Sequence, residues 1–332
     1  MQPRLSPRAS LAADRRLLDQ RGDGALRVYT IAGDVVALGR WHLAPDVAPD
    51  AGVQVWRRHS GGRAMPWGDG FVALSLVLPH RSALVSTYPF ALAPEQVMNR
   101  YVRGVLRACE LGGIAAFYPG RDLITVDGRI FGMASFEVDA RGTLLFQVVL
   151  ANERDASVLP ALLDRADPGG IVRTTMLTAA DTTSIARVLG HGIDLEQLAG
   201  WLVRGYGERL GVRFAGRHQF LVDGEFDDAG WLAARQSRAD LDRHAVVPGQ
   251  IGVLELHFAR DGGRIRDVCL AGDFIASSPT VVALEEGLRG CAAEPGALAA
   301  VVHGVLAQPE HFVLGLGPPA RVADALAREL AA

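Results

Sequence analysis

The segment from Arg57 to Ala64 reads RRHSGGRA and has the clearest capacity for chemistry in the chain. Two adjacent arginines and a pair of glycines lie here, with a third arginine at 63, between two apolar runs, 53–56 and 71–78. Glycines let the backbone approach a ligand closely, and guanidinium groups match carboxylate and phosphate oxygens in pairs. The segment therefore predicts a loop that holds an anion, although Gly-Gly also marks an ordinary turn with solvated arginines around it.

A second segment, 120–123, reads GRDL and is followed by 129–134, which reads RIFGMA. An Asp-Gly pair at 127–128 indicates a tight turn between them. Together with RRHSGGRA, these segments resemble the lipoate–protein ligase A family of the biotin/lipoate protein ligase superfamily, where RR-x-SGGGA precedes a GRNDL strand and a KVSGSA strand. Further family-like stretches follow in the same order, YGER at 206–209, ARQS at 234–237 and GVLELHF at 252–258.

The resemblance implies an activity and a site. Members of the family activate lipoate with ATP and Mg²⁺ to lipoyl-AMP, then transfer the acyl group to a lysine of a lipoyl-carrier domain, of the 2-oxoacid dehydrogenase or glycine cleavage type. It implies Arg129 and Asp122 as catalytic residues, with Asp122 also holding Mg²⁺. The residues it implies for binding substrate or nucleotide are Arg58, Ser60, Gly61, Gly62, Arg63, Ala64, Gly120, Arg121, Gly132 and Ala134.

The departures from the family pattern keep other functions open. Arg129 stands where the family has its lysine, and Arg63 replaces the third glycine of the loop. Arginine keeps the charge but is longer and planar, so it is not an equivalent replacement. The chain is thus a ligase for lipoate or a medium-chain acid, a catalytically inactive paralogue that binds an acyl-nucleotide or a lipoylated partner, or an acyltransferase with a different donor. None of the three cysteines lies in a recognisable nucleophile motif near the loop, which counts against a covalent cysteine mechanism.

Composition excludes several classes of protein. The 332 residues are about half apolar, 21% charged and carry a net charge of −3, which predicts neither nucleic-acid binding nor a strong surface field. No apolar run approaches the roughly 18 residues of a membrane span, and the start of the chain lacks an apolar signal core. The spacing of the cysteines predicts no disulfide framework, so we expect a cytoplasmic location. All 34 basic residues are arginine, which excludes a Walker-type phosphate loop and a Schiff-base lysine.

Hydrophobic periodicity predicts short strands followed by helices without a regular βαβ rhythm. This favours an α+β fold with a mixed, mostly antiparallel sheet flanked by helices, as in biotin and lipoate ligases. We expect a catalytic domain over 1–245 and a small α+β accessory domain, with two strands, over 246–332. Strands are predicted at 26–31, 34–38, 53–58, 71–78, 123–126, 129–135, 144–151, 251–258 and 264–270, the first two joined by a turn at 32–33. Helices are predicted at 10–20, 90–111, 159–165, 182–189, 195–210, 279–289, 296–306 and 319–330, with Asp181 or Thr182 capping the fourth.

Overall fold

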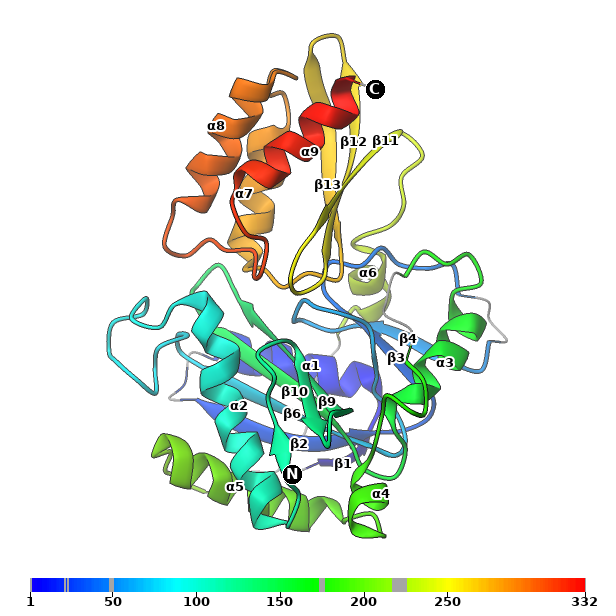
Figure 1. Ribbon diagram of the computed structural model, residues 1–332, viewed down its shortest axis with the longest axis vertical. Coiled ribbons are helices and arrows are strands. Elements are labelled where there is room, and N and C mark those ends of the chain that lie inside the picture. Colours follow the sequence, from blue (N-terminus) through cyan, green and yellow to red (C-terminus); the bar gives the residue numbers. More distant parts are fainter. Residues whose placement is uncertain are drawn as a thin grey trace.

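The computed structural model describes residues 2–20, 22, 24–47, 51–172, 177–216 and 226–331. Two sheet-based parts are stacked along the long axis of the molecule, with the N-terminus in the lower part and the C-terminus at the top (Figure 1). The lower part is organised around a seven-stranded sheet, and the upper part around a three-stranded sheet with helices on one side. The expected α+β class is confirmed.

The large sheet has the strand order β1-β2-β6-β10-β9-β8-β7. Every neighbouring pair is antiparallel except β1 and β2, so the predicted mixed, mostly antiparallel sheet is confirmed. Its strands are β1 (Gln2–Leu5), β2 (Ala25–Ile31), β6 (Phe71–Leu78), β7 (Ala116–Phe117), β8 (Leu123–Val126), β9 (Arg129–Val138) and β10 (Leu144–Ala151). Sequence periodicity missed β1 and β7, and β7 is only two residues long.

Helices cover both faces of this sheet (Figure 1). On one face, α2 (Pro94–Leu111) and α5 (Leu195–Leu210) pack against each other and over alternate residues of β6 and β10, such as Leu74 and Phe146. On the other face lies α1 (Pro7–Asp19), which contacts Val77 and Leu145. Successive side chains of a strand point to opposite faces, so each strand supplies two different layers.

A second, smaller sheet has the order β4-β3-β5 and consists of β3 (Val35–Leu38), β4 (Gln54–Arg57) and β5 (Met65–Pro66). The predicted turn at 32–33 joins the two consecutive strands β2 and β3, and these strands belong to different sheets. The 3-10 turn η1 (Ala156–Val158), α3 (Leu159–Ala166) and α4 (Ile185–Leu189) follow β10. The cap of α4 is Ser184, whose hydroxyl accepts the N–H of Arg187 at 3.3 Å, and not the predicted Asp181 or Thr182.

The upper part contains three strands where two were predicted. β12 (Val253–Asp261) is central between β11 (Arg243–Pro248) and β13 (Arg264–Gly272), and α7 (Ser278–Leu288), α8 (Pro295–Leu306) and α9 (Ala320–Ala331) cover one face. The expected domain boundary at 245/246 falls within β11 and stays a prediction. The short helix α6 (Asp228–Ala233), also missed from sequence, lies at the junction of the two parts (Figure 1).

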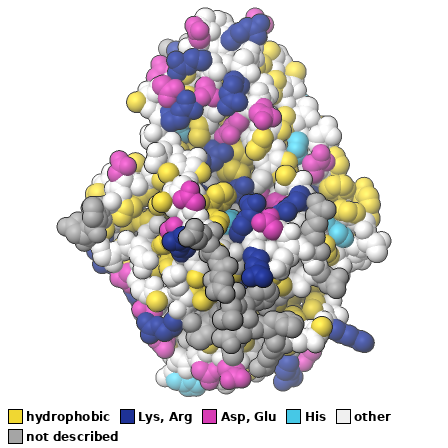
Figure 2. Space-filling view, turned by 180° about the vertical axis from the view of Figure 1, so that it is seen from behind, with side chains coloured by type: hydrophobic (Ala, Val, Ile, Leu, Met, Phe, Trp, Pro, Cys, Tyr) yellow, Lys and Arg dark blue, Asp and Glu magenta, His cyan; other side chains and the backbone are white. Residues whose placement is uncertain are grey.

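Acidic and basic side chains are mixed on the face of the molecule that Figure 2 shows. In the view from behind, arginines and carboxylates are interspersed over the upper part, without a large field of one sign (Figure 2). This agrees with the small net charge. Within the described ranges, no helix has the length and apolar character needed to cross a bilayer.

Candidate functional site

A row of polar side chains crosses the middle of the large sheet on the face that α1 covers. Arg27 of β2 lies opposite Ser75 of β6, Ser75 opposite Gln147 of β10, and Gln147 opposite Ser135 of β9. All four side chains are buried. This polar row interrupts strands that are largely apolar, and it forms the floor on which the loop 58–64 is seated.

The loop is fixed to the polar row by side-chain hydrogen bonds. The Ser60 hydroxyl donates to the side-chain oxygen of Gln147 at 2.6 Å, and the Ser135 hydroxyl donates to the carbonyl of Gly61 at 2.5 Å. The Gln147 amide in turn donates to Asp14 of α1 at 2.8 Å, and Asp14 forms a short ion pair with Arg27. The Ser75 hydroxyl also donates to Asp14, at 3.1 Å. The floor thus joins four strands, the first helix and the loop in one hydrogen-bonded network.

Arg57, the last residue of β4, and Arg58, the first residue of the loop, are buried and bind backbone carbonyls. Arg58 donates to the carbonyls of Ala37 at 2.8 Å, Gly61 at 2.5 Å and Arg63 at 2.7 Å. Burial lowers the pKa of its guanidinium to about 9. In this conformation Arg58 therefore stabilises the shape of the loop. Its N–H groups already donate to protein carbonyls, whereas binding a phosphate would require free N–H groups.

Arg57 connects the strand before the loop to segments much later in the chain. Its guanidinium donates to the carbonyls of His42 at 2.6 Å and Leu232 at 2.8 Å, and the indole N–H of Trp231 donates back to the Arg57 carbonyl at 2.8 Å. His59 packs beside Trp231, and its Nε2–H donates to the Leu11 carbonyl at 3.1 Å. Burial lowers the pKa of His59 to about 3, so its ring is neutral at physiological pH.

The upper part of the molecule closes over the glycines. The Gly62 N–H donates to the carbonyl of Phe274 at 2.7 Å. A Cβ atom at Gly61 would lie 2.7 Å from the same carbonyl oxygen, so only glycine permits this approach. Phe274 also stacks on Trp41, with ring centroids 6.0 Å apart. We call residues 273–275 the cap, because they cover the loop and occupy one of its backbone donors.

Arg63 and Asp122, both predicted site residues, meet at the edge of the loop. Both oxygens of the Asp122 carboxylate accept from the Arg63 guanidinium, the longer contact being 3.1 Å, and Asp122 is 2% exposed. Asp273 of the cap interacts electrostatically with both Arg63 and Asp122, and burial raises the pKa of its carboxyl. Mg²⁺ requires free carboxylate oxygens. It therefore does not fit at Asp122 while Arg63 holds both oxygens.

The remaining predicted residues lie away from the loop floor. Ala134 packs in the core beneath α2 and α5, and Gly132 faces Leu150 on that same side. Arg129 is exposed at the tip of the β8–β9 hairpin, five residues from Ala134, or about 16 Å along the strand. Gly120 and Arg121 are exposed in the bend before β8, whereas Ala64, the last residue of the loop, is buried. Their roles in binding and catalysis stay predictions.

Sequence reasoning missed the floor and the cap. The only available signal for the floor was a single polar residue in the middle of each apolar run, Ser75 in FVALSLVL and Gln147 in LLFQVVLA. An isolated polar residue within a buried strand needs a partner, which points to a network. Nothing in the sequence pointed to Phe274, which lies more than 200 residues beyond the loop.

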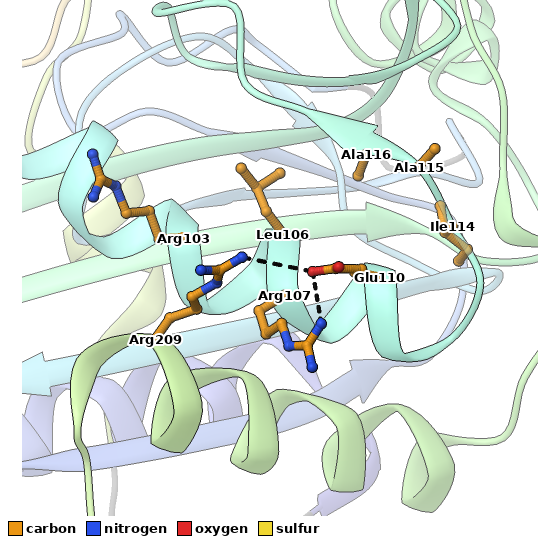
Figure 3. A pocket seen from close by; sticks show the side chains of 8 residues that line it. All are labelled: Arg103, Leu106, Arg107, Glu110, Ile114, Ala115, Ala116 and Arg209. Carbon is orange, nitrogen blue, oxygen red and sulfur yellow. Dashed lines mark ion pairs between the residues drawn. The ribbon is translucent and has the colours of Figure 1, made fainter.

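A surface recess of about 490 Å³ lies elsewhere, between α2, α5 and the start of β7. Arg107 and Arg209 both turn toward Glu110, at 2.8 and 3.8 Å, whereas Arg103 points away from them (Figure 3). The arginines that line the recess are thus partly neutralised by Glu110. The recess shares no residue with the loop, its floor or the cap.

Comparison with known proteins places the chain in a family. The family model described as the lipoyl protein ligase A/B catalytic domain matches residues 6–206. No match was found among curated protein sequences. P. falciparum LipL1 in complex with lipoate has a similar fold, with a TM-score of 0.71 and 14% identity over 99% of this chain and 98% of that one.

Two further structures resemble the chain over a smaller part of it. The bipartite lipoate protein ligase of Thermoplasma acidophilum, studied with its E2 lipoyl domain, has a TM-score of 0.54 and 17% identity over 72% of this chain and 98% of that one. Lipoate-protein ligase A bound with ATP has a TM-score of 0.51 and 19% identity, over 70% and 92%. The family match covers the loop, its floor and Asp122, and the chain therefore belongs to the lipoyl protein ligase A/B catalytic domain family.

Proposed function

We propose that this protein activates lipoate or a medium-chain acid with ATP and transfers the acyl group to a lysine of a lipoyl-carrier domain. In the first step an oxygen of the acid attacks the α-phosphorus of ATP, pyrophosphate leaves, and acyl-AMP forms. In the second step the carrier lysine attacks the acyl carbonyl, AMP leaves, and the amide retains the acyl group. Family membership supports this reaction, as do fold relatives that bind lipoate or ATP, one of them studied with a lipoyl domain.

The observation that carries the proposal is the state of Arg63. It is the loop cation whose guanidinium is held by a carboxylate, whereas Arg57 and Arg58 donate to backbone carbonyls inside the protein. A phosphate can replace a carboxylate on the same guanidinium fork. We therefore assign to Arg63 the binding of the α-phosphate, where cationic groups stabilise charge that develops during transfer.

Access to the loop requires the cap to move. The Gly62 N–H is engaged by Phe274, and the Arg63–Asp122 pair lies beside Asp273. We propose that release of residues 273–275 frees the Gly62 donor and lets the nucleotide separate Arg63 from Asp122. Mg²⁺ belongs to the proposal only through the family resemblance, and none of these steps depends on it.

A binding-only paralogue is the second candidate, favoured by the position of Arg129. Its exposed place at the hairpin tip, together with the use of Arg58 on carbonyls, leaves two of the family's cationic roles unfilled in this conformation. A cysteine acyltransferase has less support, since Cys109 is buried within α2 and burial raises its pKa to about 12. The other two cysteines, Cys269 and Cys291, belong to the upper part of the molecule.

Formation of acyl-AMP separates these candidates. The purified protein is incubated with ATP, Mg²⁺ and lipoate or octanoate, and acyl-AMP is detected by mass spectrometry. We expect product from the wild type, at least tenfold less from Arg63→Gln, and an unchanged amount from Arg209→Ala, which removes an exposed arginine of the distant recess. If Arg129→Lys forms acyl-AMP and the wild type does not, the scaffold is competent and the arginine at position 129 is what prevents the reaction. If neither the wild type nor Arg129→Lys forms product, the ligase is refuted for these substrates, and a binding-only paralogue or an acyltransferase with a different donor is favoured.

A further inference from the structure

Two histidines and a glutamate converge on the outer face of the three-stranded sheet. His244 of β11 lies directly opposite His257 of β12, and Glu255 is two residues before His257 on the same face. Leu254, Leu256 and Phe258 alternate with them and pack beneath α7, α8 and α9, so the cluster faces away from these helices. None of the three residues was singled out by the family resemblance as part of the ligase site.

The ligand atoms are arranged as a metal ion would need them. The Nε2 atoms of His244 and His257 lie 3.0 and 3.2 Å from the same carboxylate oxygen of Glu255, and one ligand atom from each residue lies within 4.8 Å of the others. Zinc binds imidazole nitrogen and carboxylate oxygen at about 2.0–2.2 Å, which places neighbouring ligand atoms about 3.0–3.5 Å apart in octahedral or tetrahedral geometry. The two separations from the Glu255 oxygen fall within that range, and a ligand atom of each histidine lies within 4.8 Å of one of the other.

The two imidazole rings are nearly parallel, and their Nε2 atoms both lie near the same oxygen of Glu255. Their ring centroids are 4.4 Å apart with an interplanar angle of 19°, and cross-strand pairing fixes both rings next to each other. The imidazole side chains keep 34% and 22% of their surface exposed, while Glu255 is 6% exposed. An ion can therefore enter from solvent, bind to a rigid set of ligands and keep water molecules in its remaining positions.

The neighbouring cysteine does not complete the set. Cys269 of β13 lies opposite His257, but its sulfur is 3.3 Å from a guanidinium nitrogen of Arg235 and burial raises the pKa of the thiol. The available ligands are thus two imidazoles and a carboxylate, which suit borderline divalent ions such as Zn²⁺ or Co²⁺ better than soft ions such as Cu⁺.

We propose that His244, Glu255 and His257 form a binding site for one divalent transition-metal ion of the zinc class. The ion would link β11 to β12. β11 continues the segment that contains Leu232 and Arg235, whose carbonyls accept from Arg57. Bound metal would therefore stiffen the connection between the upper part and the strand that precedes the loop. This site is independent of the proposed ligase activity.

Zinc binding to the full chain tests the site directly. Chelator-treated protein is titrated with ZnCl₂ by calorimetry, and its thermal midpoint is measured with and without zinc. We expect one Zn²⁺ per chain and a midpoint that rises by several degrees, because a ligand that binds only the folded state stabilises it. His244→Ala and Glu255→Gln should each weaken binding at least tenfold. His303→Ala, which removes an exposed histidine of α8, should leave binding and midpoint shift unchanged.

Cobalt substitution gives a second readout that does not depend on stability. Co²⁺ bound to two nitrogens and oxygen should give visible d–d bands without the intense thiolate charge-transfer band that Cys269 would add. The proposal is overturned if the wild type binds no more Zn²⁺ than a His244→Ala/His257→Ala double variant of intact fold, or if His303→Ala loses as much binding as His244→Ala.

Discussion

The two faces of the seven-stranded sheet are built from the same strands and serve different ends. Beneath α2 and α5, alternate residues such as Leu74 and Phe146 form a continuous apolar core. On the opposite face, Ser75 and Gln147 form the centre of a buried polar network that fixes the loop. A one-residue shift in register would exchange the two layers, so the pairing of β6 with β10 positions the site as well as the core.

The polar face fixes the position of the loop through specific hydrogen bonds, whereas the apolar face stabilises the fold through packing. An apolar face tolerates changes that conserve volume, while a buried polar network must keep every partner. Substitutions on the polar face should therefore have large effects that a second substitution can reverse. Those on the apolar face should have smaller effects that follow the change in volume.

The largest effect is expected at Asp14. Asp14→Ala leaves the buried Arg27 guanidinium without its carboxylate and should lower the free energy of unfolding by about 3–5 kcal/mol. In Asp14→Ala/Arg27→Met the unpaired charge is gone, and most of the loss should be recovered. Denaturant unfolding of the two single variants and the double variant measures this coupling. Additive losses in the double variant would contradict a paired network.

A pH-dependent effect is expected from Glu137, which lies on the polar face of β9. One carboxylate oxygen accepts the N–H of Ser278 at 3.0 Å, and the other has no hydrogen-bond partner in the described part of the chain. Burial, opposed by the charge of Arg40, raises the pKa of this carboxyl from 4.5 to about 7. The folded state then binds the proton more tightly than the unfolded state.

Stability should therefore fall as pH rises from about 4.5 to about 7, by up to about 3 kcal/mol from this residue. Glu137→Gln removes the titration and should flatten that part of the stability curve, with higher stability than wild type at pH 8. Glu286→Gln, at an exposed position of α7, is the matched control. Equal pH slopes in wild type and Glu137→Gln would show that the carboxyl titrates as it does in the unfolded chain.

On the apolar face, Phe146→Leu should cost about 1 kcal/mol, because the substitution nearly conserves volume and leaves no polar group unpaired. The loop contacts should persist, since Gln147 keeps its own partners on the other face. Thermal unfolding together with amide exchange at Gly62 checks both statements. Loss of exchange protection at Gly62 in this variant would mean that the faces are not separable.

The smallest effect on stability is expected at Arg129, which is exposed at the end of β9. Arg129→Lys should change the free energy of unfolding by less than about 0.5 kcal/mol. Chemical denaturation of both proteins measures this. A large loss would reveal a structural role at the hairpin tip, and any change in acyl-AMP yield could then not be assigned to chemistry.

Several elements were predictable from the sequence because their signals are local. The ranges of β6, β8 and β10 follow from apolar runs bounded by turns, and the family motifs brought Arg63 and Asp122 into one predicted site. Features that depend on distant parts of the chain were not predictable. Leu232 contacts Arg57, and Phe274 contacts the loop, only in the folded chain. In the upper part, the strand β11 was missed because its sequence has no alternation of apolar and polar residues strong enough to distinguish it from a connecting segment.

The proposed ligase activity requires the acyl-nucleotide to bind at the loop on the polar row. The direct measurement is calorimetric titration with a non-hydrolysable lipoyl-sulfamoyl adenosine, which mimics lipoyl-AMP. We expect one site per chain, binding weakened at least tenfold in Arg63→Gln of intact fold, and unchanged binding in Arg209→Ala. No binding to the wild type, or equal affinity in Arg63→Gln, would show that the acyl-nucleotide does not bind at this loop.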